Sequence, residues 1–163
     1  MTSLLTDETL SWVGRTLQTR THAVSRADIA KFALAIGARE PLYFDAEAAR
    51  ARGFADCVAP LGYHVAIRMS GPNLIPLHEL GGDGVSTEGI PPSRASRVMA
   101  GTTTARFHRR ITAADLITVR TKISDIVEKQ GKTRPLILVT YALDYSDQHG
   151  SPVVAERYSR VLQ

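Results

Sequence analysis

The C-terminal part of the chain constrains the fold most, because it contains long segments rich in β-branched residues. These segments are residues 98–110, 116–129, 134–146 and 153–162. Runs of turn-forming residues separate them at 112–115, 130–132 and 147–150. Long strands joined in succession by short turns pair antiparallel. The sequence therefore predicts an antiparallel meander.

The N-terminal half carries helical patterns instead. Residues 25–37 begin with the capping residue Ser25 and end with Gly37, which suits a left-handed helix cap. Apolar residues at helical spacing predict a stripe that faces a core, namely Ile29, Phe32, Ala33 and Ile36. The other expected elements are a short helix over 6–13, a strand over 17–24 and a short helix over 46–52, capped by Asp45. Helices before long strands are typical of an α+β domain.

Residues 61–70 form a nearly apolar helical segment, just after Pro60 and just before Gly71-Pro72. A helix of about ten such residues, roughly 15 Å long, is expected to be buried rather than to lie on a surface. A strongly curved sheet could enclose it. We therefore expect an α+β fold in which a long curved antiparallel sheet wraps around a central buried helix.

Length and composition limit the class of protein. A chain of 163 residues with 44% apolar residues matches one ordinary domain, so residues 1–163 are predicted to form a single domain. No apolar run approaches the ~20 residues that a membrane-spanning helix needs, and residues 1–10 lack the pattern of an export signal. We therefore expect a cytoplasmic protein without a membrane partner. The lone Cys57 excludes an intrachain disulfide and a cysteine metal cluster, and we predict no metal site.

Sixteen of the 20 basic residues are arginines. A guanidinium grips phosphate or carboxylate through two parallel hydrogen bonds, which favours anion recognition. No acid lies between Glu88 and Asp115, and this interval holds Arg94, Arg97 and Arg106. These arginines indicate either a phosphate or acidic-protein site, or an ordinary solvated strand face. Nucleic acid is not an expected partner, because aromatic residues make up only 6% of the chain and no recognition motif is present.

Several short motifs follow one another in a fixed order. They are Phe32-Ala33-Leu34-Ala35-Ile36-Gly37, Glu40-Pro41-Leu42-Tyr43, Asp45-Ala46-Glu47-Ala48-Ala49, Gly53-Phe54, Val58-Ala59-Pro60 and Arg106-Phe107-His108-Arg109. In this order they resemble the MaoC-like branch of hotdog-fold hydratases and dehydratases, over nearly the whole chain. The resemblance implies an acyl substrate carried as a coenzyme A or phosphopantetheine thioester, with no separate cofactor. It also implies a second hotdog subunit, in a homodimer or heterodimer, and suggests an acyl carrier protein as a further partner.

Residues 37–43 depart from the motif of the catalytic members, which reads Gly-Asp-x-Asn-Pro-(aliphatic)-His. Ala38 stands at the position of the aspartate, Glu40 at that of the asparagine, and Tyr43 at that of the histidine. Reversible addition of water needs groups that exchange protons, and alanine cannot do so. These departures resemble the non-catalytic, N-terminal type of MaoC-like domain. The resemblance implies a hydratase or dehydratase subunit that holds substrate and needs a catalytic partner.

Two other hypotheses stay open. An active enzyme with a rebuilt site would use Glu40 as acid or base, Tyr43 as a hydrogen-bond donor to an oxyanion, and His64 on the expected central helix. Structural roles compete with each: an exposed carboxylate, a ring at the core edge, and a core histidine bonded to a carbonyl. The third hypothesis is a non-enzymatic module that binds an acyl group.

The resemblance also suggests where an acyl thioester would bind. Arg94, Arg97 and Arg106 could meet its phosphates or the acidic surface of a carrier protein. Three apolar residues of the expected central helix, Leu61, Val65 and Met69, could line an acyl tunnel together with residues 74–77 of a Gly- and Pro-rich excursion. The same helical spacing is also typical of an ordinary core.

Overall fold

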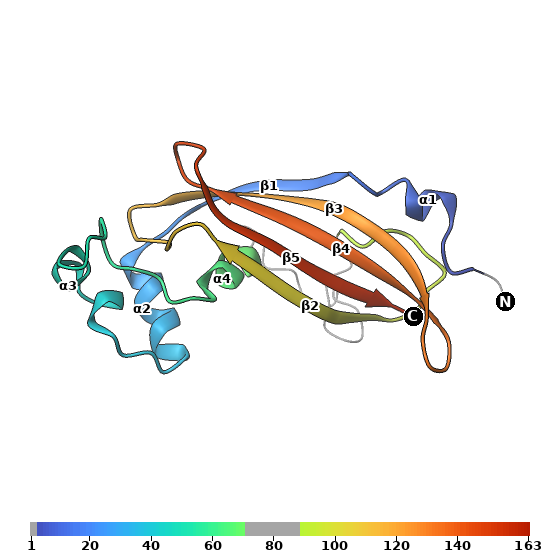
Figure 1. The fold of residues 1–163 in the computed structure, drawn as a ribbon, viewed down its shortest axis with the longest axis horizontal. Helices are drawn as coiled ribbons and strands as arrows, with labels where there is room; N and C mark the ends of the chain where they lie inside the picture. The colour runs from blue at the N-terminus through green and yellow to red at the C-terminus, as the bar shows by residue number, and fades with distance from the viewer. Residues whose placement is uncertain (1–2, 71–88) are drawn as a thin grey trace.

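The computed structural model of the chain describes residues 3–70 and 89–163. Its helical elements are α1 (Asp7–Leu10), α2 (Arg26–Ala35), the 3-10 turn η1 (Pro41–Tyr43), α3 (Ala46–Arg50) and α4 (Tyr63–Met69). Its strands are β1 (Thr16–Ala23), β2 (Val98–Phe107), β3 (Leu116–Gln130), β4 (Pro135–Ser146) and β5 (Pro152–Leu162). Figure 1 shows α2 and α3 beyond one end of the sheet and α1 near the other. None of the helices in these two ranges is long and apolar enough to cross a membrane.

The strands form one antiparallel sheet in the order β1-β3-β4-β5-β2. The predicted strands are confirmed, but the predicted meander is wrong in one connection, because β2 pairs with β5 and not with β3. The chain between β2 and β3 therefore crosses roughly 14 Å over the end of the sheet, which is the width of three strand spacings. The Arg109 guanidinium holds this crossing through Asp115 at 2.8 Å and Asp147 at 3.0 Å.

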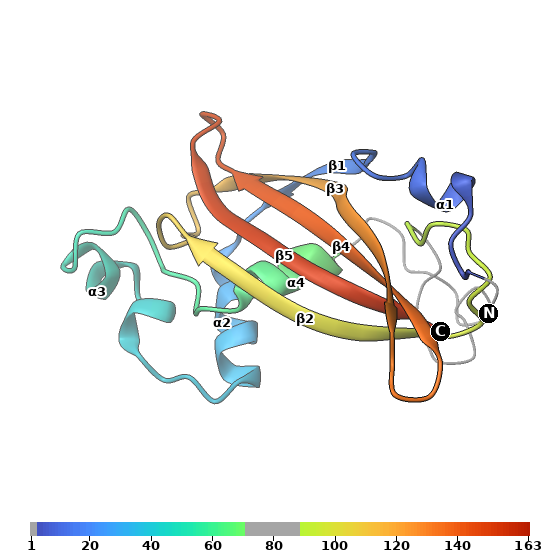
Figure 2. The ribbon, with the colours of Figure 1, turned by 45° about the vertical axis from the view of Figure 1, so that its right-hand side comes forward.

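Helix α4 lies against the concave face of the sheet, as Figure 2 shows. Tyr63, His64 and Ile67 point into the core and are buried. The expected central helix inside the curved sheet is confirmed, but α4 is shorter than predicted, with seven residues, and some residues at its ends are exposed. Leu61 is 58% exposed and Met69 is 74% exposed.

Both ends of α4 are fixed by local contacts. The helix begins after Gly62, whose φ of 99° lies in the left-handed region that glycine adopts without strain. At the other end, the Arg20 guanidinium on β1 donates hydrogen bonds to Arg68 O at 2.7 Å and Ser70 O at 3.3 Å. These contacts satisfy carbonyl groups that the last helical turn leaves unpaired. The C-terminal end of α4 is therefore tied to β1.

The predicted helix caps of the N-terminal half are confirmed. The Ser25 hydroxyl accepts the Asp28 N–H at 3.0 Å, and the Asp45 carboxylate accepts the Glu47 N–H at 2.8 Å. The predicted apolar stripe of α2 is correct for the buried Ile29 but wrong for Ile36, which is exposed. Ile36 follows the last helical residue, where the chain turns away from the core through Gly37 at φ 73°.

Strand β2 is the open edge of the sheet on the side of β5. Its residues from Met99 to Arg106 are all exposed. The pairing of β2 with β5 is irregular between Ala100 and Thr103, where the Thr102 N–H donates to Ser159 Oγ at 3.0 Å. An exposed edge offers unpaired backbone groups to another strand. The sheet is thus open to extension along β2.

Candidate functional site

The segment between α2 and α3 contains the three positions that depart from the catalytic motif. Ala38 is half-buried and donates its N–H to Ala33 O at 2.9 Å. Glu40 is exposed, and its carboxylate accepts the Arg39 N–H at 3.2 Å. Tyr43 is half-buried and packs against the core. This segment therefore offers one exposed carboxylate and one packed phenol in place of an aspartate and a histidine.

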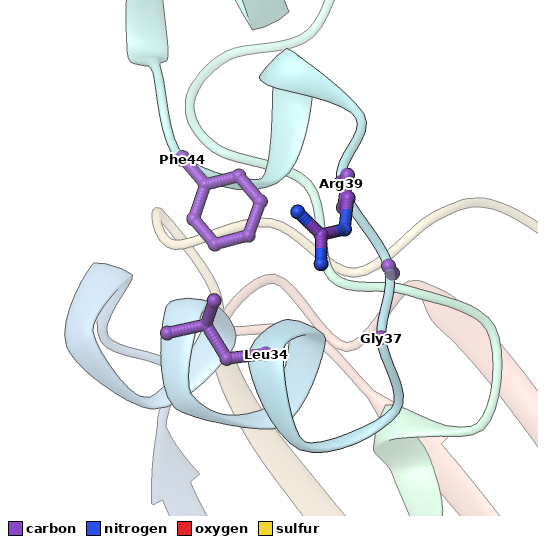
Figure 3. Close-up of a pocket in the computed structure, with 5 residues that line it drawn as sticks. Leu34, Gly37, Arg39 and Phe44 are labelled. Carbon is purple, nitrogen blue, oxygen red and sulfur yellow. The ribbon is translucent and has the colours of Figure 1, made fainter.

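A shallow hollow opens beside Ala38. It has a volume of about 370 Å³ and is lined by Leu34, Gly37, Ala38, Arg39 and Phe44. Figure 3 shows the Phe44 ring facing Leu34, with the Arg39 side chain extending toward the ring. Ala38 contributes only a methyl group to this lining. The hollow therefore contains a cation and apolar surface, but no carboxylate able to activate water.

His64 lies on the buried face of α4, away from this segment. Its ring contacts the edges of Phe107 and Tyr145, with centroid distances of 5.2 Å and 6.0 Å. Neither ring nitrogen has a hydrogen-bond partner in the described structure, so the carbonyl partner expected from the sequence is not found there. No hydrogen bond or ring contact between described residues joins His64 to Glu40 or Tyr43. The three residues of the rebuilt-site hypothesis are therefore not brought together by contacts.

The burial of His64 predicts a pH-dependent stability. Burial lowers the pKa of His64 from the usual 6.5, because the imidazolium ion is poorly solvated there, although the charge of Glu156 opposes this shift. The His64 side chain therefore binds a proton more readily in the unfolded chain than in the folded one. The contribution of neutral His64 to stability is complete above the pKa of the unfolded chain, and it declines as the pH falls through that pKa. We expect the urea midpoint to drop more steeply between about pH 7.5 and about pH 5.5 in the wild type than in His64→Phe. Equal slopes would show that His64 is not buried in its neutral form.

A buried polar cluster next to His64 joins α4 to the sheet. The Arg68 guanidinium donates to one Glu156 oxygen at 2.6 Å, and the Tyr145 hydroxyl donates to the other at 2.6 Å. The Glu156 side chain is 0% exposed. The same Tyr145 hydroxyl lies 3.3 Å from His64 O. Burial, followed by the neighbouring carboxylate, raises the pKa of Tyr145, so the phenol keeps its proton.

Aromatic rings extend this cluster along the concave face. Tyr158 stacks on Tyr141 with ring centroids 4.6 Å apart, and the Arg68 guanidinium lies 4.5 Å above the Tyr158 ring. Cation–π contact and the ion pair to Glu156 thus hold the guanidinium from two sides. The pairing of Arg68 with Glu156 was not predicted from the sequence. The sequence signal for this pair is that Glu156 stands two residues after Val154 and two residues before Tyr158 on β5. Alternate residues of a strand share one face, so Glu156 lies on the same face as these two apolar residues.

The residues predicted to bind substrate fall into two groups. Leu61, just before α4, and Met69, at its end, are exposed, and Val65 on α4 is half-buried; these three residues are called the apolar stripe below. Residues 74–77 lie outside the described residues. The role of the apolar stripe as a tunnel lining stays a prediction.

The predicted arginines do not gather at one point. Arg97 precedes the first residue of β2 and Arg106 is near its last residue, so they are about 30 Å apart along the strand. Arg94 forms a hydrogen bond within the chain, because its guanidinium donates to Ser3 O at 3.0 Å. A single phosphate group therefore cannot engage both Arg97 and Arg106.

The antiparallel sheet curved around the central helix α4 defines a hotdog protein, and comparisons with known proteins identify its family. Residues 11–156 match the family model of the FAS1-like dehydratase domain region, and the chain belongs to this family. It is a MaoC-like hotdog domain of the hydratase and dehydratase kind, as its motifs predicted.

Relatives of known sequence and structure agree with this family. The chain is 31% identical over 154 residues to the probable enoyl-CoA hydratase alpha subunit of Thermomonospora curvata, covering 91% of this chain and 48% of that protein. It therefore spans about half the length of that relative. The fold is similar to a chain of the ChsH1-ChsH2 complex from Mycobacterium tuberculosis, with a TM-score of 0.73, 18% identity, and coverage of 95% and 93%. It is also similar to the MaoC-like dehydratase from Rhodospirillum rubrum, with a TM-score of 0.64, 24% identity, and coverage of 92% and 91%.

Proposed function

We propose that the chain is the substrate-holding subunit of a MaoC-like acyl-thioester hydratase or dehydratase. The catalytic aspartate and histidine would come from a partner hotdog subunit. One observation carries this proposal: the segment after α2 has a methyl group at position 38, an exposed Glu40 and a packed Tyr43. No proton-exchanging pair is assembled by the contacts described there. The family membership supplies the reaction class.

Two open surfaces support the need for a partner. The β2 edge is exposed, so a strand of a second subunit could continue the sheet. In the part of the chain that the structure describes, Leu61 and Met69 of the apolar stripe are exposed too, and Val65 is half-buried. A partner placed along β2 would cover both, and the acyl group would lie between the stripe and the partner. A relative named as an alpha subunit and a neighbour solved as a two-protein complex favour a heterodimer.

Reconstitution tests this proposal. The purified chain is assayed for hydration of crotonyl-CoA alone, then with a hotdog protein that retains the aspartate and histidine and is encoded beside it. We expect no turnover by this chain alone and turnover by the pair. Turnover by the chain alone would overturn the proposal and favour the rebuilt site. Measured binding of crotonyl-CoA with no turnover in the pair would favour the acyl-binding module.

Two substitutions separate the proposal from the rebuilt-site hypothesis within the pair. Glu40→Gln removes the carboxylate, and Tyr43→Phe removes the hydroxyl, while each keeps the size of the side chain. We expect both variants to support turnover within about twofold of the wild type, because neither residue takes part in proton transfer. A loss of 10²-fold or more in kcat from either variant would assign that residue to the chemistry.

A further inference from the structure

Arg68 lies at the border between the buried side of α4, which it shares with His64 one turn earlier, and the side that carries Val65 and Met69. It lies between Val65 and Met69 in the last helical turn, and its side chain is 20% exposed. Among the described residues, Glu156 is the only hydrogen-bond acceptor for its guanidinium. A guanidinium has five N–H donors, and one of them is used in this contact. Arg68 therefore retains donors beside the stripe.

Stability alone gives little reason for this arrangement. A buried ion pair contributes less to stability than well-packed apolar residues of similar size, because both charges lose their hydration. Glu156 needs no further partner, since Arg68 and Tyr145 bond its two oxygens. The pair holds the guanidinium in one place, against Tyr158. A charged group held rigidly beside an open surface is well placed to bind a ligand.

The register of the sheet places Arg68 close to the open edge. Its partner Glu156 pairs with Ala105 of β2, and Tyr158 pairs with Thr103. Ala105 and Thr103 are exposed. Because residues paired across antiparallel strands share one face, these two residues lie on the concave side, one strand away from the cluster. The guanidinium thus stands between the stripe and the edge along which a partner would add.

We propose that Arg68 makes this subunit selective for acyl thioesters whose chain carries an oxygen beyond the reacting carbons, above all a carboxylate. This inference rests on the proposed function, which places an acyl group along the stripe. An alkyl chain at this position would remove water from the guanidinium and offer no acceptor in return. A carboxylate or hydroxyl oxygen would replace that water with a charge-assisted hydrogen bond.

Matched pairs of thioesters test the selectivity. Calorimetry measures the Kd of butyryl-CoA and succinyl-CoA, hexanoyl-CoA and adipoyl-CoA, and octanoyl-CoA and suberoyl-CoA, with the full chain together with its catalytic partner. The members of each pair differ in having a terminal methyl group or a terminal carboxylate. We expect the carboxylate to bind about tenfold more tightly in at least one pair, as a charge-assisted hydrogen bond predicts.

Variants assign this preference to Arg68. The double variant Arg68→Met/Glu156→Gln removes both charges while Tyr145 keeps an acceptor. For this variant, we expect the ratio of the Kd of the methyl-ended thioester to the Kd of its carboxylate-ended partner to fall to within about twofold of one. The control Arg157→Gln removes a guanidinium from the opposite face of β5 and should keep the wild-type ratio. Ratios near one at all three lengths in the wild type would overturn the inference while leaving the proposed function intact. Failure of all six thioesters to bind would overturn the proposed function, and the inference with it.

Discussion

Replacing Arg68 by methionine is expected to lower the free energy of unfolding by about 3 to 5 kcal/mol. The substitution leaves the carboxylate of Glu156 with only the Tyr145 hydroxyl, at a position that is 0% exposed. An unpaired charge in such a place loses its hydration without compensation. Urea unfolding followed by circular dichroism measures the loss.

The double variant Arg68→Met/Glu156→Gln is the matched control for this prediction. It removes the charge that the single variant leaves unpaired, and the amide oxygen of glutamine accepts from Tyr145. We expect it to recover most of the lost stability, to within about 1 to 2 kcal/mol of the wild type. A single variant as stable as the wild type would show that Glu156 reaches water. Equal losses in both variants would point to lost packing of the Arg68 side chain instead.

The second large effect is expected from Gly101→Val on the edge strand. A Cβ atom at position 101 would overlap Ser159 Oγ and come within 3.0 Å of Ser159 O. The overlap involves backbone as well as side chain, so β2 would have to move away from β5 at its irregular pairing. We expect a loss of about 1 to 3 kcal/mol in the free energy of unfolding, which is typical of overpacking.

Gly101→Val should also weaken assembly, because β2 is the strand that the partner would extend. Analytical ultracentrifugation of the reconstituted pair measures this effect. Ala100→Val serves as the control, since it also introduces a valine on β2, at the exposed neighbouring position. Strands favour β-branched residues. Intact stability and assembly in Gly101→Val would contradict the close approach of β2 and β5. A stable monomer that fails to assemble would place the effect at the edge alone.

Local signals were sufficient to predict most of the elements. Ser25 and Asp45 cap their helices through their own side chains, and both contacts lie within three residues. Gly37 marks the end of α2 because its backbone conformation favours glycine. The order of strands was not predictable in the same way. The pairing of β2 with β5 depends on the crossing near Arg109, which bonds Asp115 in the same connection and Asp147 in the distant β4–β5 turn.

The candidate site shows the same division. The absence of a carboxylate at Ala38 can be read directly from the sequence, and so can the apolar positions of α4. The ion pair of Arg68 with Glu156 joins residues 88 positions apart, and no local periodicity links them. That no hydrogen bond or ring contact of the described residues joins His64 to Glu40 or Tyr43 was also beyond local patterns, because it depends on how α4 lies on the sheet.

The exposed edge of β2 has a consequence for the supply of this protein in the cell. The unpaired backbone groups of an edge strand can form hydrogen bonds with other exposed strands, including the same strand of another molecule. Synthesis in excess over the proposed partner subunit would therefore favour aggregation. Synthesis of this chain and the proposed partner in equal amounts, for instance from one transcript, would limit this aggregation.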